Sequence, residues 1–352
     1  MKALTLVAPS TFSFGEAPAP SPKNSEVLVN VKACGICGSD LHGMDGSSGR
    51  RIPPVIMGHE AAGEIVAIGD GVSGWQVGDR VTFDSTESCG TCPDCKAGFV
   101  NLCPNRKVLG VSCGDYRRDG CFAEQVTLPQ HILYRLPEDL AFEHAAFAEP
   151  VAIALHAVNL APTPVEHASA PSTRQEMAVV IGAGLIGLLV IQALKARGWK
   201  RVFAVDLDEA RLKLAKQLGA EDVFNAREEG LAAKLRKLGG GDGLDVSFEV
   251  VGAAAPVDLA IRSVRKGGTV VLVGNLQPNV PFPLQEVVTR QITLRGSCSC
   301  AGEYPEAIER IQDGSIQVQP LLSQVSPLSD GARWFHQATQ PGNGLFKIVL
   351  KP

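Results

Sequence analysis

The stretch MAVVIGAGLIGLLVIQALKARG, residues 177–198, decides the fold of the second half of this chain. It begins as an uninterrupted apolar strand, passes through a turn with glycines at positions 182, 184 and 187, and continues as an apolar helix. Glycines at this spacing allow a tight turn, a close approach of the backbone to a pyrophosphate, and close packing of the helix on the strand. Because a helix N-terminus attracts phosphate charge, the stretch predicts a dinucleotide-binding unit.

The next segment, residues 201–220, has the pattern of a second strand followed by a second helix. Asp206 lies nineteen residues after Gly187, at the end of this strand. A carboxylate at that place accepts hydrogen bonds from the adenosine ribose and repels a 2′-phosphate, which favours NAD over NADP. Asp208 is interpreted as the N-cap of the helix and not as a ligand.

Two further strands are expected at residues 244–251 and 269–273, and their alternation with helices predicts a parallel, doubly wound α/β sheet. Residues 250–252 and 273–274 then lie at the carboxyl ends of these strands, where the nicotinamide half of the cofactor would bind. The alternative is that they are ordinary strand ends of the core.

Four cysteines in CGTCPDCKAGFVNLC, at positions 89, 92, 95 and 103, are close enough in sequence to supply one tetrahedral thiolate shell. A closed shell of this kind is typical of a structural zinc ion. An iron–sulfur cluster or two disulfides are the alternatives. Zinc is favoured because a second group of metal ligands, upstream, indicates the same ion.

The second group combines Cys37, in ACGICGSDLHG, with His59 and Glu60, in MGHEAAGE. Three protein ligands leave the fourth position of a zinc ion open, as in catalytic zinc sites. The carboxylate ligand could be Glu60 or Glu149, which lies far along the chain in AFAEPVAIALHA. Each residue alone is weak evidence, and it is the combination that predicts a metal site.

Composition narrows the remaining classes of protein. A net charge of −4 gives no sign of a nucleic-acid-binding surface, and no apolar run reaches the roughly 18 residues of a membrane span. The N-terminus, MKALTLVAPSTFSFGE, is expected to form a first strand, without a secretion signal, in a cytoplasmic protein. The glycine-punctuated segment 61–82 predicts short strands, so the first of two domains should be β-rich and barrel-like.

Together these motifs resemble the zinc-dependent medium-chain dehydrogenase/reductase family. GICGSDLH, GHEAAGE, the four-cysteine loop, DGCFAEQV, AEPVAIALHA and VIGAGLIG occur in the order of that family, over essentially the whole chain. In having a glutamate in AEP, the chain resembles the polyol branch of this family, which includes sorbitol, threonine and galactitol-phosphate dehydrogenases. The resemblance implies a GroES-like catalytic domain (residues 1–152 and 294–352) and a Rossmann NAD-binding domain (153–293), joined by an unusually long Pro- and Ser-rich linker at 160–177.

The resemblance also implies roles for the catalytic residues, which are Cys37, Ser39, His42, His59, Glu60 and Glu149. Cys37 and His59 match zinc ligands, while the two glutamates match carboxylates that alternate as ligand and as partner of the zinc-bound water. Ser39 matches the hydroxyl that contacts the substrate oxygen, and His42 matches the imidazole that passes the proton to solvent.

The expected cofactors are NAD and two zinc ions per chain, one catalytic and one structural. The residues expected to contact NAD are Gly182, Gly184, Leu185, Ile186, Gly187, Asp206, Arg211, Val250, Val273, Gly274 and Ser297. The resemblance further implies a homodimer or homotetramer, and the apolar segment VPFPLQEVV is a candidate for an edge between subunits.

The implied reaction is oxidation of a secondary alcohol of a polyol or sugar derivative to the ketone, by hydride transfer to NAD. A threonine 3-dehydrogenase is the main alternative, and a sugar-phosphate or sugar-acid substrate is a further one. The latter depends on Arg50–Arg51 and Arg117–Arg118, which could bind an anion but could equally lie in solvated loops. Two other classes remain: a lyase or epimerase that uses NAD transiently, and a binding protein that has lost the reaction.

Overall fold

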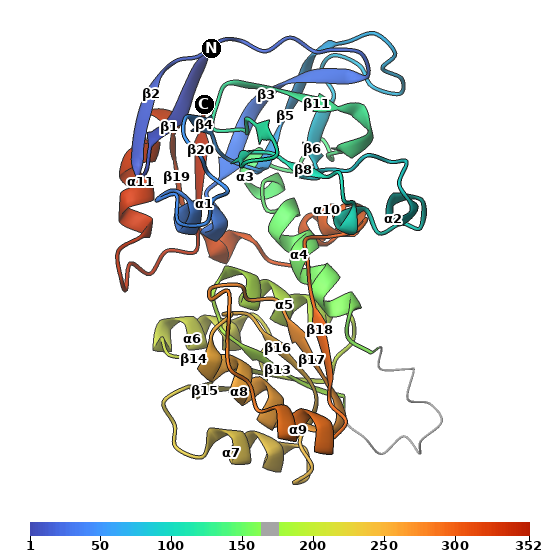
Figure 1. The fold of residues 1–352 in the computed structure, drawn as a ribbon, viewed down its shortest axis with the longest axis vertical. Helices are drawn as coiled ribbons and strands as arrows, with labels where there is room; N and C mark the ends of the chain where they lie inside the picture. Colours follow the sequence, from blue (N-terminus) through green and yellow to red (C-terminus); the bar gives the residue numbers. More distant parts are fainter. Residues whose placement is uncertain (163–175) are drawn as a thin grey trace. The chain divides into compact units, whose positions relative to one another are not determined.

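The computed structural model describes residues 1–162 and 176–352, so most of the predicted linker lies outside the described residues. The chain divides into two compact units (Figure 1). The first comprises Met1–Ala152, Ala301–Gly314 and Val318–Pro352, and the second comprises Ile153–Cys300 and Ser315–Gln317. Among the described residues, no helix combines the length and the apolar character that crossing a membrane requires.

The second unit is built on a parallel sheet with the strand order β15-β14-β13-β16-β17-β18. Its strands are β13 (Met177–Ile181), β14 (Arg201–Asp206), β15 (Asp222–Asn225), β16 (Leu244–Glu249), β17 (Val264–Leu272) and β18 (Thr293–Gly296). Its helices are α5 (Leu185–Ala196), α6 (Glu209–Gln217), α7 (Leu231–Leu238), α8 (Ala254–Ser263) and α9 (Leu284–Thr289). The predicted doubly wound α/β fold is confirmed, and the order reverses between β13 and β16, where such sheets bind dinucleotides.

The chain re-enters the first unit at Ala301 and not at the predicted residue 294. The difference arises because β18 pairs in parallel with β17 and forms the edge of the second sheet. All four residues of β18 are exposed, so the segment has no apolar pattern that would announce a strand.

The first unit is rich in β-structure, as the glycine-punctuated sequence predicted. Its strands are β1 (Lys2–Ala8), β2 (Thr11–Glu16), β3 (Glu26–Gly35), β4 (Val55–Ile56), β5 (Glu60–Ile68), β6 (Arg80–Phe83), β7 (Thr86–Glu87), β8 (Lys107–Val108), β9 (Val111–Ser112), β10 (Arg117–Arg118), β11 (Gln125–Pro129), β12 (Leu133–Arg135), β19 (Leu322–Pro327) and β20 (Lys347–Lys351). Its helices are α1 (Gly38–Gly43), α2 (Pro93–Lys96), α3 (Phe142–Ala145), α10 (Tyr304–Gln312) and α11 (Gly331–Ala338), while α4 (Ala148–Asn159) contains the unit boundary.

Strand β3 is the centre of the main sheet, whose order is β12-β6-β5-β3-β20-β19 with β11 also pairing to β3. Alternate residues of β3, including Val27, Val29 and Val31, point into a core that is closed by Phe83, Phe122 and other apolar side chains. The late strand β20 pairs antiparallel with β3 and therefore lies beside a segment more than 300 residues earlier in the chain (Figure 1). This sheet positions the candidate site described below.

The glycine-rich turn yields a direct test of the packing. A Cβ atom added at Gly187 would lie 1.8 Å from the carbonyl oxygen of Gly182, whereas a Cβ at Gly184 would meet nothing closer than 4.0 Å. We expect Gly187→Ala to lower the free energy of unfolding by about 2 kcal/mol or more, because backbone atoms must move. The matched variant Gly184→Ala should change it by less than about 1 kcal/mol. Chemical denaturation of both variants checks this, and equal losses would contradict it.

Candidate active site

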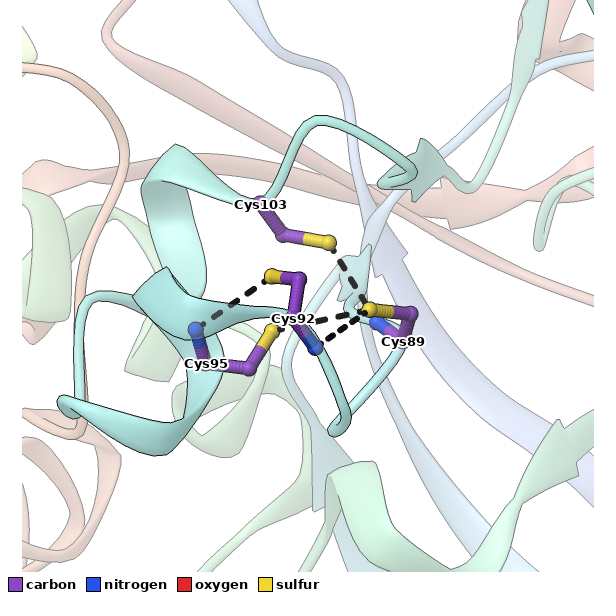
Figure 2. A group of neighbouring side chains, drawn as sticks. All are labelled: Cys89, Cys92, Cys95 and Cys103. Carbon is purple, nitrogen blue, oxygen red and sulfur yellow. Dashed lines mark hydrogen bonds between the residues drawn. The ribbon is translucent and has the colours of Figure 1, made fainter.

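The four cysteines of the loop at 89–103 converge on one point (Figure 2). Their sulfur atoms lie within 4.8 Å of one another, and all ten cysteines of the chain are free, so the two-disulfide alternative is not supported. Cys92 caps helix α2, where its Sγ accepts the N–H of Cys95 at 3.4 Å, and Gly90 and Gly98 take left-handed conformations that let the loop close.

Backbone donors prepare this group for a cation. The N–H groups of Thr91 and Cys92 lower the pKa of Cys89 to about 5, which favours the thiolate that binds metals. The pKa of Cys92 is raised to about 12, in spite of the N–H of Cys95, by burial and by the neighbouring thiols. Thiolates this close together repel one another, and a cation between them would favour the ionised forms.

Cys37, His59 and Glu60 form a second group, with ligand atoms within 4.8 Å of one another. Cys37 follows β3 and caps helix α1, and Glu60 is the first residue of β5. Because Gly35 of β3 pairs with Glu60, strand pairing brings the end of β3 to the start of β5. A soft thiolate, an imidazole and a carboxylate are a donor set that fits zinc.

Asp40 is a member of this site to which the sequence analysis assigned no role. It is fully buried, and its Oδ1 lies 3.1 Å from a guanidinium nitrogen of Arg51 and 3.5 Å from Nδ1 of His59. Burial would raise the pKa of Asp40, but His59 and Arg51 hold it well below its usual range. With Nδ1 facing a carboxylate, the ring of His59 is oriented so that Nε2 is left for a metal. The signal was available in the same GSDLH motif.

Arg51 is therefore not a free cation. Its side chain is buried against Asp40, and Arg118 pairs with Glu87 through its Nε. Neither supports the hypothesis of an anion-binding pair, and Arg51 does not lie in a solvated loop either. Arg50 and Arg117 are exposed, with Arg117 3.8 Å from Asp119.

Lys347 is the second residue that the sequence reasoning missed. Only 1% of its side chain is exposed, and its Nζ donates hydrogen bonds to Oε2 of Glu60 and, at 3.1 Å, to the carbonyl of Ile36. No local pattern indicates this role, because Lys347 lies 287 residues from Glu60 in the sequence.

Glu149 lies in the first turn of α4 and outside the group formed by Cys37, His59 and Glu60. Burial, reinforced by the charge of Glu60, raises the pKa of Glu149 to about 8. The structure thus places Glu60 with the cysteine and histidine, and Glu149 close enough to interact electrostatically with Glu60 and His59.

The two residues expected to move a proton lie on helix α1. Ser39 Oγ is 3.4 Å from Nε2 of His59, so the hydroxyl borders the group of ligands. His42 is exposed in the last turn of the same helix, three residues later and on the same face as Ser39. A hydroxyl near the ligands and an imidazole in solvent are a suitable pair of ends for a proton path.

In the second unit, the glycine-rich turn is closely packed at Gly187 and open at Gly184. Gly182 has a φ of +101° and lies against Val251. Gly184 caps α5, and the atom nearest to a Cβ added there would be a guanidinium nitrogen of Arg211, 4.0 Å away. Leu185 and Ile186 form the first turn of α5. Exposed backbone at the N-terminus of α5, beside the guanidinium of Arg211, is suited to binding a pyrophosphate.

Asp206 ends β14 and is held by three backbone donors. Its Oδ2 accepts the N–H of Ala183 at 2.6 Å, and its Oδ1 accepts the N–H groups of Leu207 and Asp208 at 2.7 and 3.0 Å. Asp208 caps α6 by accepting from Ala210 and Arg211, as predicted. The carboxylate of Asp206 is thus fixed beside the glycine-rich turn, where an adenosine ribose would be recognised.

The ends of β16 and β17 are joined by a residue that the sequence reasoning missed, Glu249. Its carboxylate accepts the N–H groups of Val251 and Gly252, both at 2.8 Å, and its carbonyl accepts those of Val273 and Gly274 at 2.8 and 3.0 Å. Burial raises the pKa of Glu249, in spite of these donors. Glu249 therefore binds both segments predicted to contact nicotinamide, the first through its side chain and the second through its backbone carbonyl.

Two further contacts concern those segments. Gly252 and Gly274 touch so closely that a Cβ on Gly274 would lie 2.1 Å from the nitrogen of Gly252. Ser297 donates its N–H to the carbonyl of Leu272 at 2.8 Å, while its buried hydroxyl has no hydrogen-bond partner among the described residues. An unpaired buried hydroxyl at this edge of the sheet fits a bound polar ligand.

Comparison with known proteins identifies the family. Residues 23–138 match the alcohol dehydrogenase GroES-like domain, and residues 186–313 match the zinc-binding dehydrogenase domain. The sorbitol dehydrogenase of Bacillus subtilis strain 168 is 32% identical over 356 residues, which cover 100% of this chain and 97% of that protein. The chain belongs to the zinc-binding alcohol dehydrogenase family.

Two solved structures share the whole architecture of this dehydrogenase. A zinc-binding dehydrogenase from Sinorhizobium meliloti 1021 bound to NADP is 30% identical with a TM-score of 0.88, covering 100% of this chain and 99% of that one. An alcohol dehydrogenase from Escherichia coli CFT073 complexed with NADH is 28% identical with a TM-score of 0.88 and the same coverage. The chain is thus a zinc-type oxidoreductase acting on CH–OH groups, with a four-cysteine structural site and a Cys–His–Glu catalytic site, and its relatives bind NAD(H) or NADP.

The four-cysteine site generates a prediction for this dehydrogenase. We expect Cys103→Ser to lower the zinc content from two ions per chain to one and to lower the free energy of unfolding by about 2 kcal/mol or more, because a structural metal contributes folding energy. Cys113→Ser is the matched control, since Cys113 lies outside both ligand groups. Metal analysis and thermal unfolding of both variants check this. Two zinc ions retained in Cys103→Ser would contradict the assignment.

Proposed function

We propose that this chain is an NAD-dependent polyol dehydrogenase, which oxidises a secondary alcohol flanked by hydroxyls to a ketone. The observation that carries the proposal is the convergence of Cys37, His59 and Glu60, with the charged groups that orient them, in a chain that also has a dinucleotide site. The reaction transfers a hydride from the alcohol carbon to the nicotinamide and releases one proton.

Cys37, His59 and Glu60 would hold the catalytic zinc. Zinc at this place supplies Lewis-acid activation of a hydroxyl oxygen, which lowers the pKa of the alcohol. Asp40, whose Oδ1 lies 3.5 Å from Nδ1 of His59, would favour the tautomer that carries its proton on Nδ1. Ser39 would accept the proton that leaves the alcohol, and His42 would pass it to solvent from the exposed face of α1.

The preference for NAD rests on Asp206. Its carboxylate is anchored by three N–H groups, so it cannot easily swing away from a 2′-phosphate. Repulsion between two anions would then disfavour NADP, while ribose hydroxyls could donate to the same oxygens.

The choice of an uncharged, hydroxylated substrate is supported by the sorbitol dehydrogenase among the relatives and by the arginines of the first unit. Arg51 and Arg118 already pair with acidic side chains, so these two arginines do not support a phosphate or carboxylate group on the substrate. Threonine oxidation stays as the second candidate, because no described contact distinguishes an amino alcohol from a polyol.

A second copy of the chain is proposed to cover the edge strand β18. The surface around it exposes large apolar side chains, which are Leu276, Phe282, Leu284, Val288 and Leu294. Unpaired backbone groups at a sheet edge pair readily with another strand, and apolar side chains beside them favour burial. A homodimer or an assembly of dimers follows from this proposal.

The proposed activity is tested by NADH formation from zinc-replete protein with sorbitol, xylitol, galactitol, their phosphates, sugar acids, threonine and simple alcohols. We expect turnover with an uncharged polyol and stoichiometric NADH release. Cys37→Ala should lose both the second zinc ion and turnover while remaining folded, because one of the three ligands is gone. A fully active Cys37→Ala protein would refute the zinc mechanism, and NAD that stays bound and returns to its oxidised form would indicate a lyase or epimerase.

The cofactor preference generates a separate prediction. Asp206→Asn keeps an oxygen that accepts hydrogen bonds but removes the charge. We expect the ratio of kcat/KM for NAD over NADP to fall by about tenfold, mainly through a lower KM for NADP, because the repulsion of the 2′-phosphate is lost. Asp208→Asn, at the helix cap, is the control and should leave the ratio unchanged. An unchanged ratio in Asp206→Asn would exclude Asp206 as the discriminating residue.

A further inference from the structure

Helix α5 carries one polar side chain in an otherwise apolar stretch. Residues 187–194 of this helix are all buried, and Gln192 is the only one among them with a hydrogen-bonding side chain. It is 3% exposed. Because a buried amide costs free energy unless its donor and acceptor atoms are paired, glutamine at this position needs a specific partner.

The partner is the backbone of Gln317, which lies 125 residues later in the chain. The N–H of Gln317 donates to Oε1 of Gln192 at 2.7 Å, and its carbonyl accepts a hydrogen bond from Nε2 of Gln192 at 3.2 Å. The side-chain amide thus pairs with both backbone groups of one residue, as a neighbouring strand would. Gln317 itself is exposed, and its side chain takes no part in this pair.

Gln317 ends a short segment that interrupts the first unit. Ser315–Gln317 belongs to the second unit, whereas Gly314 and Val318, on either side of it, belong to the first. Within the segment, Ile316 is fully buried and its two neighbours are exposed. Gln192 therefore holds, inside the second unit, the connection between helix α10 and strand β19.

This connection leads into the sheet that carries the candidate metal ligands. Strand β19 follows it after a single 3₁₀ turn, Gln319–Leu321. β19 pairs in parallel with β20, β20 pairs antiparallel with β3, and β3 ends at Gly35, shortly before Cys37. At its N-terminus, α5 begins at the glycine-rich turn that is suited to a pyrophosphate. Gln192 thus joins the helix of the dinucleotide site to the chain segment that enters the sheet of the metal site.

We propose that Gln192 is a positioning residue for hydride transfer, which acts by anchoring the segment Ser315–Gln317 to helix α5. The inference rests on the proposed dehydrogenase function. In that reaction, a hydride passes from an alcohol carbon at the metal ligands of the first unit to a nicotinamide carried by the second unit. Because a misplacement of about 1 Å can slow such a step by about a hundredfold, the connections between the units must yield little.

The test is the rate of NADH formation in a single turnover of zinc-replete Gln192→Leu protein, with the alcohol that the wild type oxidises best. Leucine keeps the apolar packing of α5 but cannot pair with the backbone of Gln317. We expect the rate to fall by about tenfold while KM for NAD and the content of two zinc ions per chain stay unchanged, because no ligand of either site is altered. Gln317→Leu is the matched control and should keep the wild-type rate, since the pair uses only the backbone of that residue.

Hydrogen exchange gives a readout that does not depend on activity. In the peptide that contains Gln317, exchange should be about tenfold faster in Gln192→Leu than in the wild type, because the N–H of Gln317 has lost its acceptor. The same peptide should exchange at the wild-type rate in Gln317→Leu. If the leucine variant does not fold, Gln192→Met, which is unbranched like glutamine, takes its place with the same expected results.

Two outcomes would overturn the inference. One is an unchanged rate of hydride transfer in a variant whose Gln317 peptide exchanges faster, since the pair would then serve stability alone. The other is unchanged exchange, since the segment would then be held without Gln192. A wild type that contains both zinc ions and forms no NADH from any alcohol would instead overturn the proposed function.

Discussion

The antiparallel pairing at Gly35, with β5 on one side and β20 on the other, is the constraint on which the candidate metal centre depends. It places Glu60 directly opposite Gly35 and brings Lys347 to the same point, while the chain continues through Ile36 to Cys37. Strand pairing fixes these positions through many backbone hydrogen bonds, so the sheet determines where the side chains of the site lie.

Buried ion pairs hold the acidic side chains of the site in addition to the strand pairing. Asp40 is buried with Arg51, and Glu60 is buried with Lys347, so each carboxylate has its own cation. Without such partners a buried carboxylate would cost several kcal/mol or take up a proton. The paired acids in turn fix the ligands, because Asp40 faces His59 and Glu60 belongs to the ligand group itself. Charged groups of the chain itself thus help to arrange the site.

The sequence revealed those parts of the molecule whose signal is local. The glycine-rich turn at 182–187 and the cysteines at 89–103 are contiguous, and each spacing has a direct physical meaning. Lys347 was missed because it comes from a distant segment, whereas Asp40 lies within the GSDLH motif, three residues after Cys37. Arg51 looked available for an anion because it belongs to the basic pair Arg50–Arg51, although in the fold it is buried. Glu249 was overlooked because an acid at the end of an apolar strand resembles an ordinary strand end.

The position of β20 in the chain has a consequence for how this protein matures. The pair Glu60–Lys347 closes across 287 residues, and the segment between them contains the entire second unit. During synthesis the cysteines, His59 and Glu60 leave the ribosome long before the strand that supplies their counter-ion. The early chain therefore has these ligands without the lysine that forms an ion pair with Glu60. The buried form of this site is therefore completed only when β20 pairs with β3 and brings Lys347 to Glu60.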